Sequence, residues 1–178
     1  MVTRTIKIIG TTQEEINARK FNIFIGISLG NKWFTEEHIR EYVVWSLDKT
    51  KKDILIFVAD KLHAINYRIK DYYNETNAIR RALRVGDKYL SLIQEIIKSL
   101  PKEKQKLISV LRWEELINTK HYYEHMKIIY EEFNKNPEFK RFVFKIVRNN
   151  LRSIKDRKFS KEEIKGLAQY VLDEYGPK

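Results

Sequence analysis

Four short apolar runs constrain the fold of this chain more than any other feature of its sequence. They occupy residues 5–10, 22–28, 53–60 and 106–113, are rich in β-branched residues and are nearly continuous in apolar character. Such runs are typical of buried strands in a parallel sheet, and stretches with helical periodicity separate them. We therefore predict an α/β fold, a Rossmann-like parallel sheet flanked by helices.

Helical periodicity marks five further stretches, at 35–49, 75–99, 118–134, 137–155 and 160–175. The first begins after Thr35, a favourable N-cap, and has acidic residues in its first turn. The second places apolar residues on one helical stripe, namely Ile79, Leu83, Leu90, Ile93 and Ile97. Three of the stretches follow the last apolar run, so the C-terminal half should be rich in helix.

The chain has 178 residues with 43% hydrophobic content, and no linker rich in proline, glycine or serine divides it. This length is sufficient for one good core, and we expect residues 1–178 to form a single catalytic domain. No long apolar segment or secretory signal is visible, which predicts a soluble cytoplasmic protein without a membrane partner. The absence of cysteine excludes disulfides and thiolate metal sites.

Ser28 stands in the pentapeptide GISLG, which fits the G-x-S-x-G pattern of a hydrolase nucleophile and equally fits a strand end bracketed by glycines. At the end of the second run, its hydroxyl should lie at the carboxyl edge of the sheet, where α/β folds bind ligands. A hydrolase triad is disfavoured. Only 27 residues precede Ser28, and no histidine follows an acidic loop in the required order. Dinucleotide fingerprints, P-loops and ATP motifs are also missing.

His121 and His125 have the i, i+4 spacing of a pair of metal ligands. A third ligand is not evident, so a solvated helix face is the favoured interpretation and we expect no metal.

The formal charge of +11 favours a polyanionic partner over the alternative of a basic protein that binds nothing. The basic residues also cluster. Arg80, Arg84 and Lys88 recur at i, i+4 and i+8, with Arg81 adjacent. A second helical face carries Arg141, Lys145, Arg148, Arg152 and Lys155, opposite Phe142, Ile146 and Val147. Because solvated faces usually mix charge signs, this bias favours contact with a phosphate backbone over a membrane surface.

Several segments in order resemble the signature segments of the tRNA-dependent cyclodipeptide synthases. They are GISLGNKWF, a helix ending near WSL, DILIFVAD followed by HAINYRI, and GLAQYVLDE, spread over residues 20–175. The serine motif alone is weakly specific. Its combination with a Y-x-x-x-E motif near the end, in the right order, is much more specific.

This resemblance implies a domain like the catalytic domain of tyrosyl- and tryptophanyl-tRNA synthetases. It also implies an enzyme that needs neither ATP nor another cofactor and uses two aminoacyl-tRNAs as partners. A serine, here Ser28, accepts the first aminoacyl group. The second aminoacyl-tRNA supplies the next residue, and the dipeptidyl-enzyme cyclises to a diketopiperazine. The two basic faces would then bind tRNA.

The resemblance also assigns further residues. Tyr170 and Glu174 would hold the α-amino group and take its proton, although a core tyrosine beside a surface glutamate is the alternative. Asn31 occupies the variable position after the serine, where asparagine marks one subgroup. Leu55 and Phe57 would line the pocket for the first side chain, or simply belong to the sheet core. Gly26 would let substrate approach the backbone, or only shape the turn.

Family members continue past this last helix into a loop with another tyrosine that relays protons during cyclisation, whereas this sequence ends at YGPK.

Two other functions stay open, a non-catalytic RNA-binding domain and a serine esterase. Nothing in the helices demands a second subunit, so we expect a monomer. The sequence does not identify the two amino acids that are joined.

Overall fold

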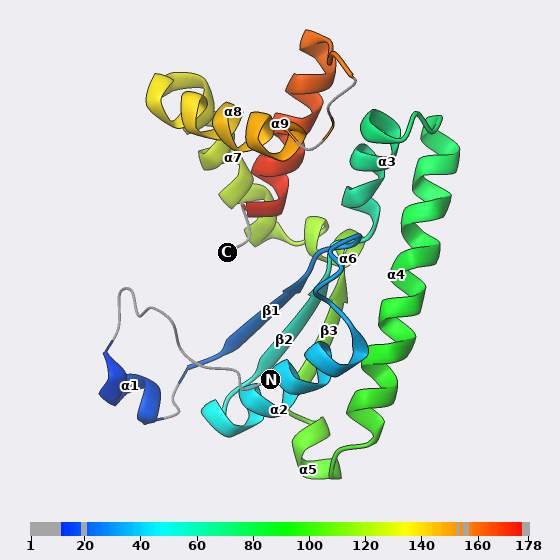
Figure 1. Cartoon of the computed structure of the whole chain (residues 1–178). Helices are drawn as coiled ribbons and strands as arrows, with labels where there is room; N and C mark the ends of the chain where they lie inside the picture. The colour runs from blue at the N-terminus through cyan, green and yellow to red at the C-terminus, as the bar shows by residue number, and fades with distance from the viewer. Residues whose placement is uncertain (1–11, 19–20, 153, 155–156, 176–178) are drawn as a thin grey trace. The chain divides into compact units, whose positions relative to one another are not determined.

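The computed structural model describes residues 12–18, 21–152, 154 and 157–175 (Figure 1). The strand expected at 5–10 lies outside these residues. The chain groups into two compact units. The sheet unit comprises Met1–Ala59 and Arg84–Arg112, and the helical unit comprises Asp60–Leu83 and Trp113–Lys178. The single domain expected from the sequence stays a prediction.

The sheet unit contains a three-stranded parallel sheet in the order β1-β2-β3, which confirms a Rossmann-like fold. Its strands match three of the expected runs, and its helices include the expected one after Thr35. The elements are α1 (Gln13–Asn17), β1 (Ile23–Ile27), α2 (Glu36–Lys49), β2 (Ile54–Val58), α5 (Lys102–Gln105), β3 (Ile108–Arg112) and the C-terminal part of α4 (Glu75–Lys98). The Thr35 side chain accepts a hydrogen bond from the His38 amide at 3.3 Å and caps α2 as expected.

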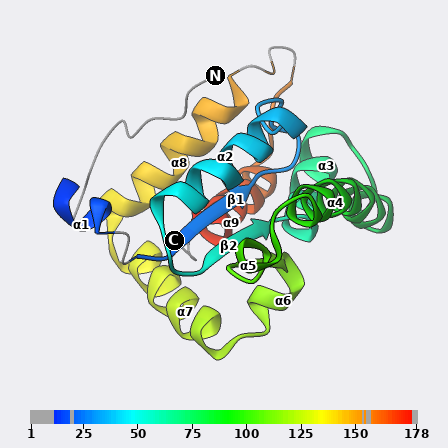
Figure 2. The same ribbon diagram turned by 90° about the horizontal axis from the view of Figure 1, so that it is seen from below.

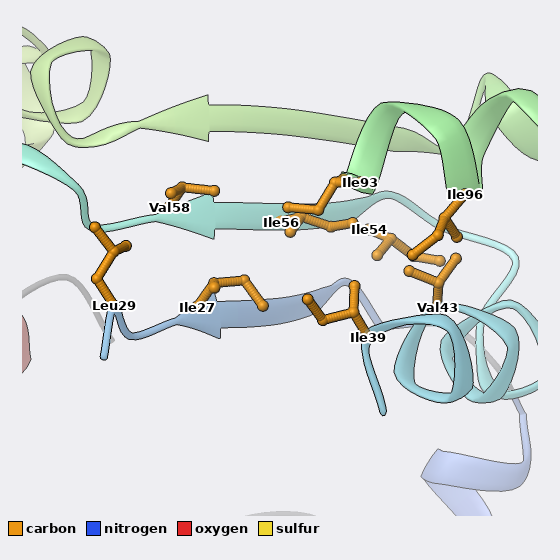
Figure 3. Packing of buried hydrophobic residues seen from close by; sticks show 9 residues of the cluster. All are labelled: Ile27, Leu29, Ile39, Val43, Ile54, Ile56, Val58, Ile93 and Ile96. Carbon is orange, nitrogen blue, oxygen red and sulfur yellow. The ribbon is translucent and has the colours of Figure 1, made fainter. Parts of the chain in front are cut away.

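One face of the sheet is packed by both connecting helices. Parallel strands are joined by right-handed crossovers, and because the order β1-β2-β3 advances in one direction, successive crossovers lie on the same face. Figure 3 shows the resulting core, in which branched side chains from the strands meet those of α2 and α4. The fully buried members are Ile27, Leu29, Ile39, Val43, Ile54, Ile56, Val58, Ile93 and Ile96.

Helix α4 is continuous and runs lengthwise in Figure 1 and nearly end-on in Figure 2. Its expected stripe is confirmed at Ile93, and Leu90 and Ile97 pack partly buried against the core. The buried positions of α4 are Ala78, Ala82, Gly86, Ile93 and Ile96, so the prediction differs mainly in the N-terminal half of the helix. Ala78 and Ala82 pack against Ala64 and Tyr67 of α3. Two alanines allow close helix contact, and the larger Ile79 and Leu83 therefore stand at the border of the buried stripe.

The helical unit begins directly after β2. It contains η1 (Lys61–His63), α3 (Ala64–Lys70), the start of α4, α6 (Trp113–Ile117), α7 (Lys120–Lys135), α8 (Pro137–Leu151) and α9 (Lys161–Tyr175). The last three are the C-terminal helices expected from the sequence. Side-chain caps from Thr119, Asn136 and Ser160 begin them. None of the described helices is long and apolar enough to span a bilayer.

Candidate active site

Ser28 follows β1 directly, at the carboxyl edge of the parallel sheet. Its neighbours Ile27 and Leu29 are only 1% and 2% exposed and belong to the core on the packed face. Side chains alternate along an extended strand, so Ser28 belongs to the opposite face, as Gly26 does. Ser28 is half-buried. The position of Ser28 at this edge of the sheet agrees with the sequence prediction, and its role as nucleophile stays a prediction.

A tight turn follows Ser28. The Asn31 amide donates to the Ser28 carbonyl at 3.4 Å, and Gly30 has φ 78°, which fits the third position of a type II turn. Glycine is favoured there because a side chain is strained at positive φ. Asn31 Oδ1 accepts a hydrogen bond from the Trp33 amide at 3.0 Å. Asn31 thus stabilises the turn, and its proposed contact with substrate stays a prediction.

The loop beyond the turn is fastened to α2 by aromatic residues. Trp33 stacks on the His38 ring with centroids 4.4 Å apart, and its indole N–H donates to the Tyr42 hydroxyl at 2.5 Å. The His38 Nδ1 atom lies 2.6 Å from the Trp33 carbonyl oxygen. These three residues hold the backbone that follows the candidate nucleophile. Sequence analysis missed them, although the GNKWF segment was part of the resemblance.

Leu55 and Phe57 lie on one face of the sheet, and Gly26 lies on the same face. In the parallel register Phe57 pairs with Gly26, and Leu55 pairs with Phe24. The rings of Phe24 and Phe57 lie 5.9 Å apart. A Cβ at Gly26 would come within 3.2 Å of the Phe24 ring, so glycine keeps this position open. Phe24 is 40% exposed and Phe57 only 4%, so the apolar surface on this sheet face is mainly that of Phe24, which sequence reasoning missed. A pocket role for Leu55 and Phe57 stays a prediction.

Tyr170 and Glu174 lie one turn apart on α9, so they share a helix face as predicted. Tyr170 is 8% exposed, and its ring meets the His63 ring edge-on at 6.3 Å. It lines a cavity of about 20 Å³ together with Asn66 and Lys70 of α3. Burial lowers the pKa of Lys70, while the negative charges of Asp71 and Glu174 act in the opposite direction. The structure thus adds Asn66 and Lys70 to the predicted pair.

Two features fix α9 against α3. A Cβ at Gly166 would lie 3.0 Å from Ile69 Cδ1, so the glycine permits close approach of the helices. Arg157, which precedes α9, donates to the carbonyl oxygens of Ile69 and Lys70 and pairs with Glu163. These contacts set the position of Tyr170 relative to the α3 side chains.

The expected basic residues of α4 differ in exposure. Arg80, Arg84 and Lys88 are exposed and share one helical face. The Arg81 guanidinium instead lies over the rings of Tyr67 and Tyr73, at 5.1 and 5.3 Å from their centroids. Arg81 therefore contributes to the packing of the helical unit, and its contact with RNA stays a prediction.

The second basic face consists of the exposed residues Arg141, Lys145 and Arg148 of α8 and of Arg152, which caps the C-terminus of that helix. Lys155 lies outside the described residues. The buried side of α8 is Val143 and Val147, and not Phe142, which is 58% exposed. The expected apolar face is therefore confirmed at Val147 and wrong at Phe142. Among the described residues, no group of three or more His, Cys, Asp or Glu is placed to hold a metal ion, and His121 and His125 are both exposed.

A family model described as cyclodipeptide synthase matches residues 5–175, nearly the whole sequence. This chain belongs to the cyclodipeptide synthase family. Membership supports cyclodipeptide synthase activity for the chain. A search of curated protein sequences found no match.

Solved cyclodipeptide synthases share the fold. One from Fluoribacter dumoffii has a TM-score of 0.77 and 17% identity, over 93% of this chain and 74% of the other. The Mycobacterium tuberculosis enzyme, which is related to type I tRNA synthetases, has a TM-score of 0.75 and 18% identity over 92% and 69%. An enzyme from Candidatus Glomeribacter gigasporarum, solved with bound Phe-tRNAPhe, has a TM-score of 0.59 and 22% identity over 85% and 69%.

His63 makes the stability of this cyclodipeptide synthase depend on pH. Burial, with a smaller contribution from the positive charge of Lys70, lowers the pKa of His63 from 6.5 to about 4. The unfolded chain therefore binds the proton more readily, and stability falls as pH drops from 6.5 toward 4. We expect a loss of about 1 kcal/mol per pH unit in this window. Denaturant unfolding near pH 7 and near pH 5 measures it.

The non-titrating variant His63→Gln should lose part of this pH dependence. His121→Gln, at an exposed position of α7, is the matched control and should retain it. Equal slopes for wild type and His63→Gln would contradict the assignment.

Proposed function

We propose that this protein joins two aminoacyl groups, each delivered by an aminoacyl-tRNA, into a cyclic dipeptide through an ester on Ser28. The observation that carries the proposal is the place of Ser28, at the carboxyl edge of the sheet on a turn held by Gly30 and Asn31. Parallel α/β sheets bind their ligands at this edge. A loop fastened to α2 gives the hydroxyl a defined position, and positioning is a large part of catalysis by acyl transfer.

Each proposed step exchanges one bond for another. The Ser28 oxygen attacks the carbonyl carbon of the first aminoacyl ester, and the 3′ oxygen of the tRNA leaves with the serine proton. The α-amino group of the aminoacyl-enzyme then attacks the ester carbonyl of the second aminoacyl-tRNA and forms a peptide bond, and the 3′ oxygen of that tRNA leaves with a proton from the amine. Finally the new α-amino group attacks the Ser28 ester, which closes the ring and returns the proton to Ser28. Two activated esters become two amides, so no ATP is required.

Tyr170 and Glu174 are proposed to hold the α-ammonium of the aminoacyl group and to accept its proton. A carboxylate beside a phenol is a suitable pair for an ammonium ion, because charge-assisted hydrogen bonds are the stronger ones. Lys70 interacts electrostatically with this pair, since the negative charge of Glu174 raises the pKa of the lysine against the larger lowering effect of burial. The apolar surface of Phe24, Leu55 and Phe57 is proposed to contact the first side chain.

Product formation tests the proposal. The purified protein is incubated without ATP with a pool of charged tRNAs, and cyclic dipeptides are sought by mass spectrometry. Uncharged tRNA with free amino acids is the control and should give no product. A diketopiperazine that appears only with charged tRNA supports the proposal. No cyclic product from the complete pool would refute it.

The basic faces favour a second candidate, a non-catalytic RNA-binding domain. Such a protein would bind tRNA through Arg80, Arg84 and Lys88 of α4 and through the basic face of α8, and would form no product. The same incubation separates the two functions. A serine esterase would instead hydrolyse small activated esters and ignore tRNA.

Charge reversal at Arg148 and Arg152 tests the basic face of α8. Both side chains are exposed. We expect Arg148→Glu/Arg152→Glu to weaken tRNA binding at least tenfold at low salt. The slope of log affinity against log salt should also fall, by roughly 0.7 to 0.9 for each phosphate that the variant no longer neutralises. Filter binding across a salt series measures both quantities.

The matched control is Lys102→Glu/Lys104→Glu, which makes the same charge change at exposed positions of α5. It should weaken binding much less. If the two double variants lose affinity equally, only net charge matters and the basic face of α8 has no specific role.

A further inference from the structure

The helical unit contains a larger pocket, between α7, α8 and α9. Its volume is about 390 Å³, within the range of cavities that accept small organic ligands. The pocket lies on a different side of α9 from Tyr170, because its α9 residues are Lys165, Ala168, Gln169 and Leu172. It is therefore distinct from the surroundings of the proposed catalytic pair.

Aromatic side chains form much of the wall. Tyr130 and Phe133 come from α7 and Phe144 from α8. The Phe133 and Phe144 rings lie 5.9 Å apart at 53°. Tyr130 donates its hydroxyl proton to Asp173 Oδ1 at 2.8 Å. Burial raises the pKa of Tyr130, which keeps the hydroxyl protonated and this bond in place. The wall is thus built before any ligand enters.

Polar groups of two kinds complete the lining. Lys140 and Lys165 bring positive charge, and the Lys140 ammonium lies 5.4 Å from the centre of the Phe133 ring. Asn134 and Gln169 contribute side-chain amides. Aromatic rings favour a ligand with a planar apolar group, and ammonium ions favour a ligand with an anionic group. Side-chain amides pair with a ligand edge that carries both hydrogen-bond donors and acceptors. A nucleotide, with its base and phosphate, combines all three.

The pocket also borders the basic face of α8. Arg148 follows Phe144 by four residues and Arg141 follows Lys140 by one, so the pocket and the basic face are adjacent around the helix. A polyanion along the basic face would pass the mouth of the pocket. This continuity favours a nucleotide within an RNA chain over a free nucleotide.

We propose that this pocket binds one unpaired base of an RNA whose phosphates follow the basic face of α8. The inference rests on the proposed function only in taking RNA as the partner. Base stacking on aromatic side chains supplies affinity with little dependence on sequence, while the lysines contact the neighbouring phosphate.

The test compares two fluorescent single-stranded RNAs of about 12 nucleotides, one intact and one with abasic riboses, by anisotropy. The wild type should bind the intact RNA about tenfold more tightly. Phe144→Leu keeps apolar volume but removes the ring, and should abolish most of this preference. Phe142→Leu, at the exposed ring two residues away on α8, is the matched control and should keep it.

Equal binding of intact and abasic RNA by the wild type would overturn the proposal, as would an unchanged preference in a folded Phe144→Leu protein. If Phe144→Leu does not fold, the double variant Lys140→Gln/Lys165→Gln, at exposed positions, replaces it in this test. Affinity of this double variant for both RNAs equal to that of the wild type would overturn the proposal. Adenosine monophosphate that binds as tightly as the RNA would show a free-nucleotide site instead. None of these measurements uses dipeptide synthesis. The outcome for the pocket can therefore be told apart from the outcome for the proposed enzymatic function.

Discussion

Ser28→Ala is expected to abolish cyclic dipeptide synthesis, with a loss of at least about a thousandfold. Without the hydroxyl no ester can form on the enzyme, and the reaction loses its covalent intermediate. Intact-protein mass spectrometry should show an aminoacyl adduct on the wild type after brief exposure to charged tRNA and none on the variant. Product should be lost in parallel, while tRNA binding is retained.

Ser109→Ala is the matched control for this prediction. Ser109 is an exposed serine of β3 that pairs with Leu55 in the same sheet. Its loss removes one hydroxyl from the sheet unit and should leave both the adduct and the product at wild-type levels. Cyclic dipeptide from Ser28→Ala at a rate near that of the wild type would refute the covalent mechanism, even if the family activity is present.

The parallel sheet was predictable because each strand carries its own signal. β1 and β2 are short and almost wholly apolar, β3 is interrupted only by Ser109 and Arg112, and the helices between them have a different period. The position of Ser28 followed from the end of one run. The turn after it was also predictable, because Gly30 and Asn31 are residues that turns favour, and Gly30 indeed has a positive φ.

Contacts between distant segments were not predictable. The surroundings of Tyr170 come from α3, about a hundred residues earlier in the chain, and no local pattern relates His63, Asn66 or Lys70 to α9. Helix α3 itself is short, and its sequence AINYRIK gives too few turns for a periodic signal. The fastening of Trp33 by His38 and Tyr42 depends likewise on where α2 packs.

The buried faces of two helices were partly misassigned, because small residues were left out of them. On α4 the stripe was drawn through Ile79 and Leu83, whereas Ala78 and Ala82 are the buried positions beside Tyr67. Hydrophobicity ranks isoleucine above alanine, but close packing of two helices selects the smaller side chain. The same preference for large residues placed Phe142 on the buried side of α8, where Val143 lies beside the correctly predicted Val147.

Glu174→Gln should give the second large effect, a loss of product of about a hundredfold or more. The amide keeps the shape of the side chain but holds an ammonium ion weakly and takes no proton from it. The first ester exchange requires neither property, whereas attack by the α-amino group requires both. We therefore expect the aminoacyl adduct on Ser28 to persist in this variant while the cyclic product disappears, with both followed by mass spectrometry.

Asp173→Asn is the control, because it makes the same change of carboxylate to amide at the adjacent position of α9. Asp173 accepts its hydrogen bond from Tyr130, and an asparagine carbonyl can still accept it, so product formation should persist. Tyr170→Phe should fall between the two variants, since it removes a hydrogen bond but no charge. Loss of the adduct together with the product in Glu174→Gln would place this carboxylate in the first ester exchange. The role of Glu174 in the attack by the amino group would then be wrong, while the role of Ser28 as nucleophile would be unaffected.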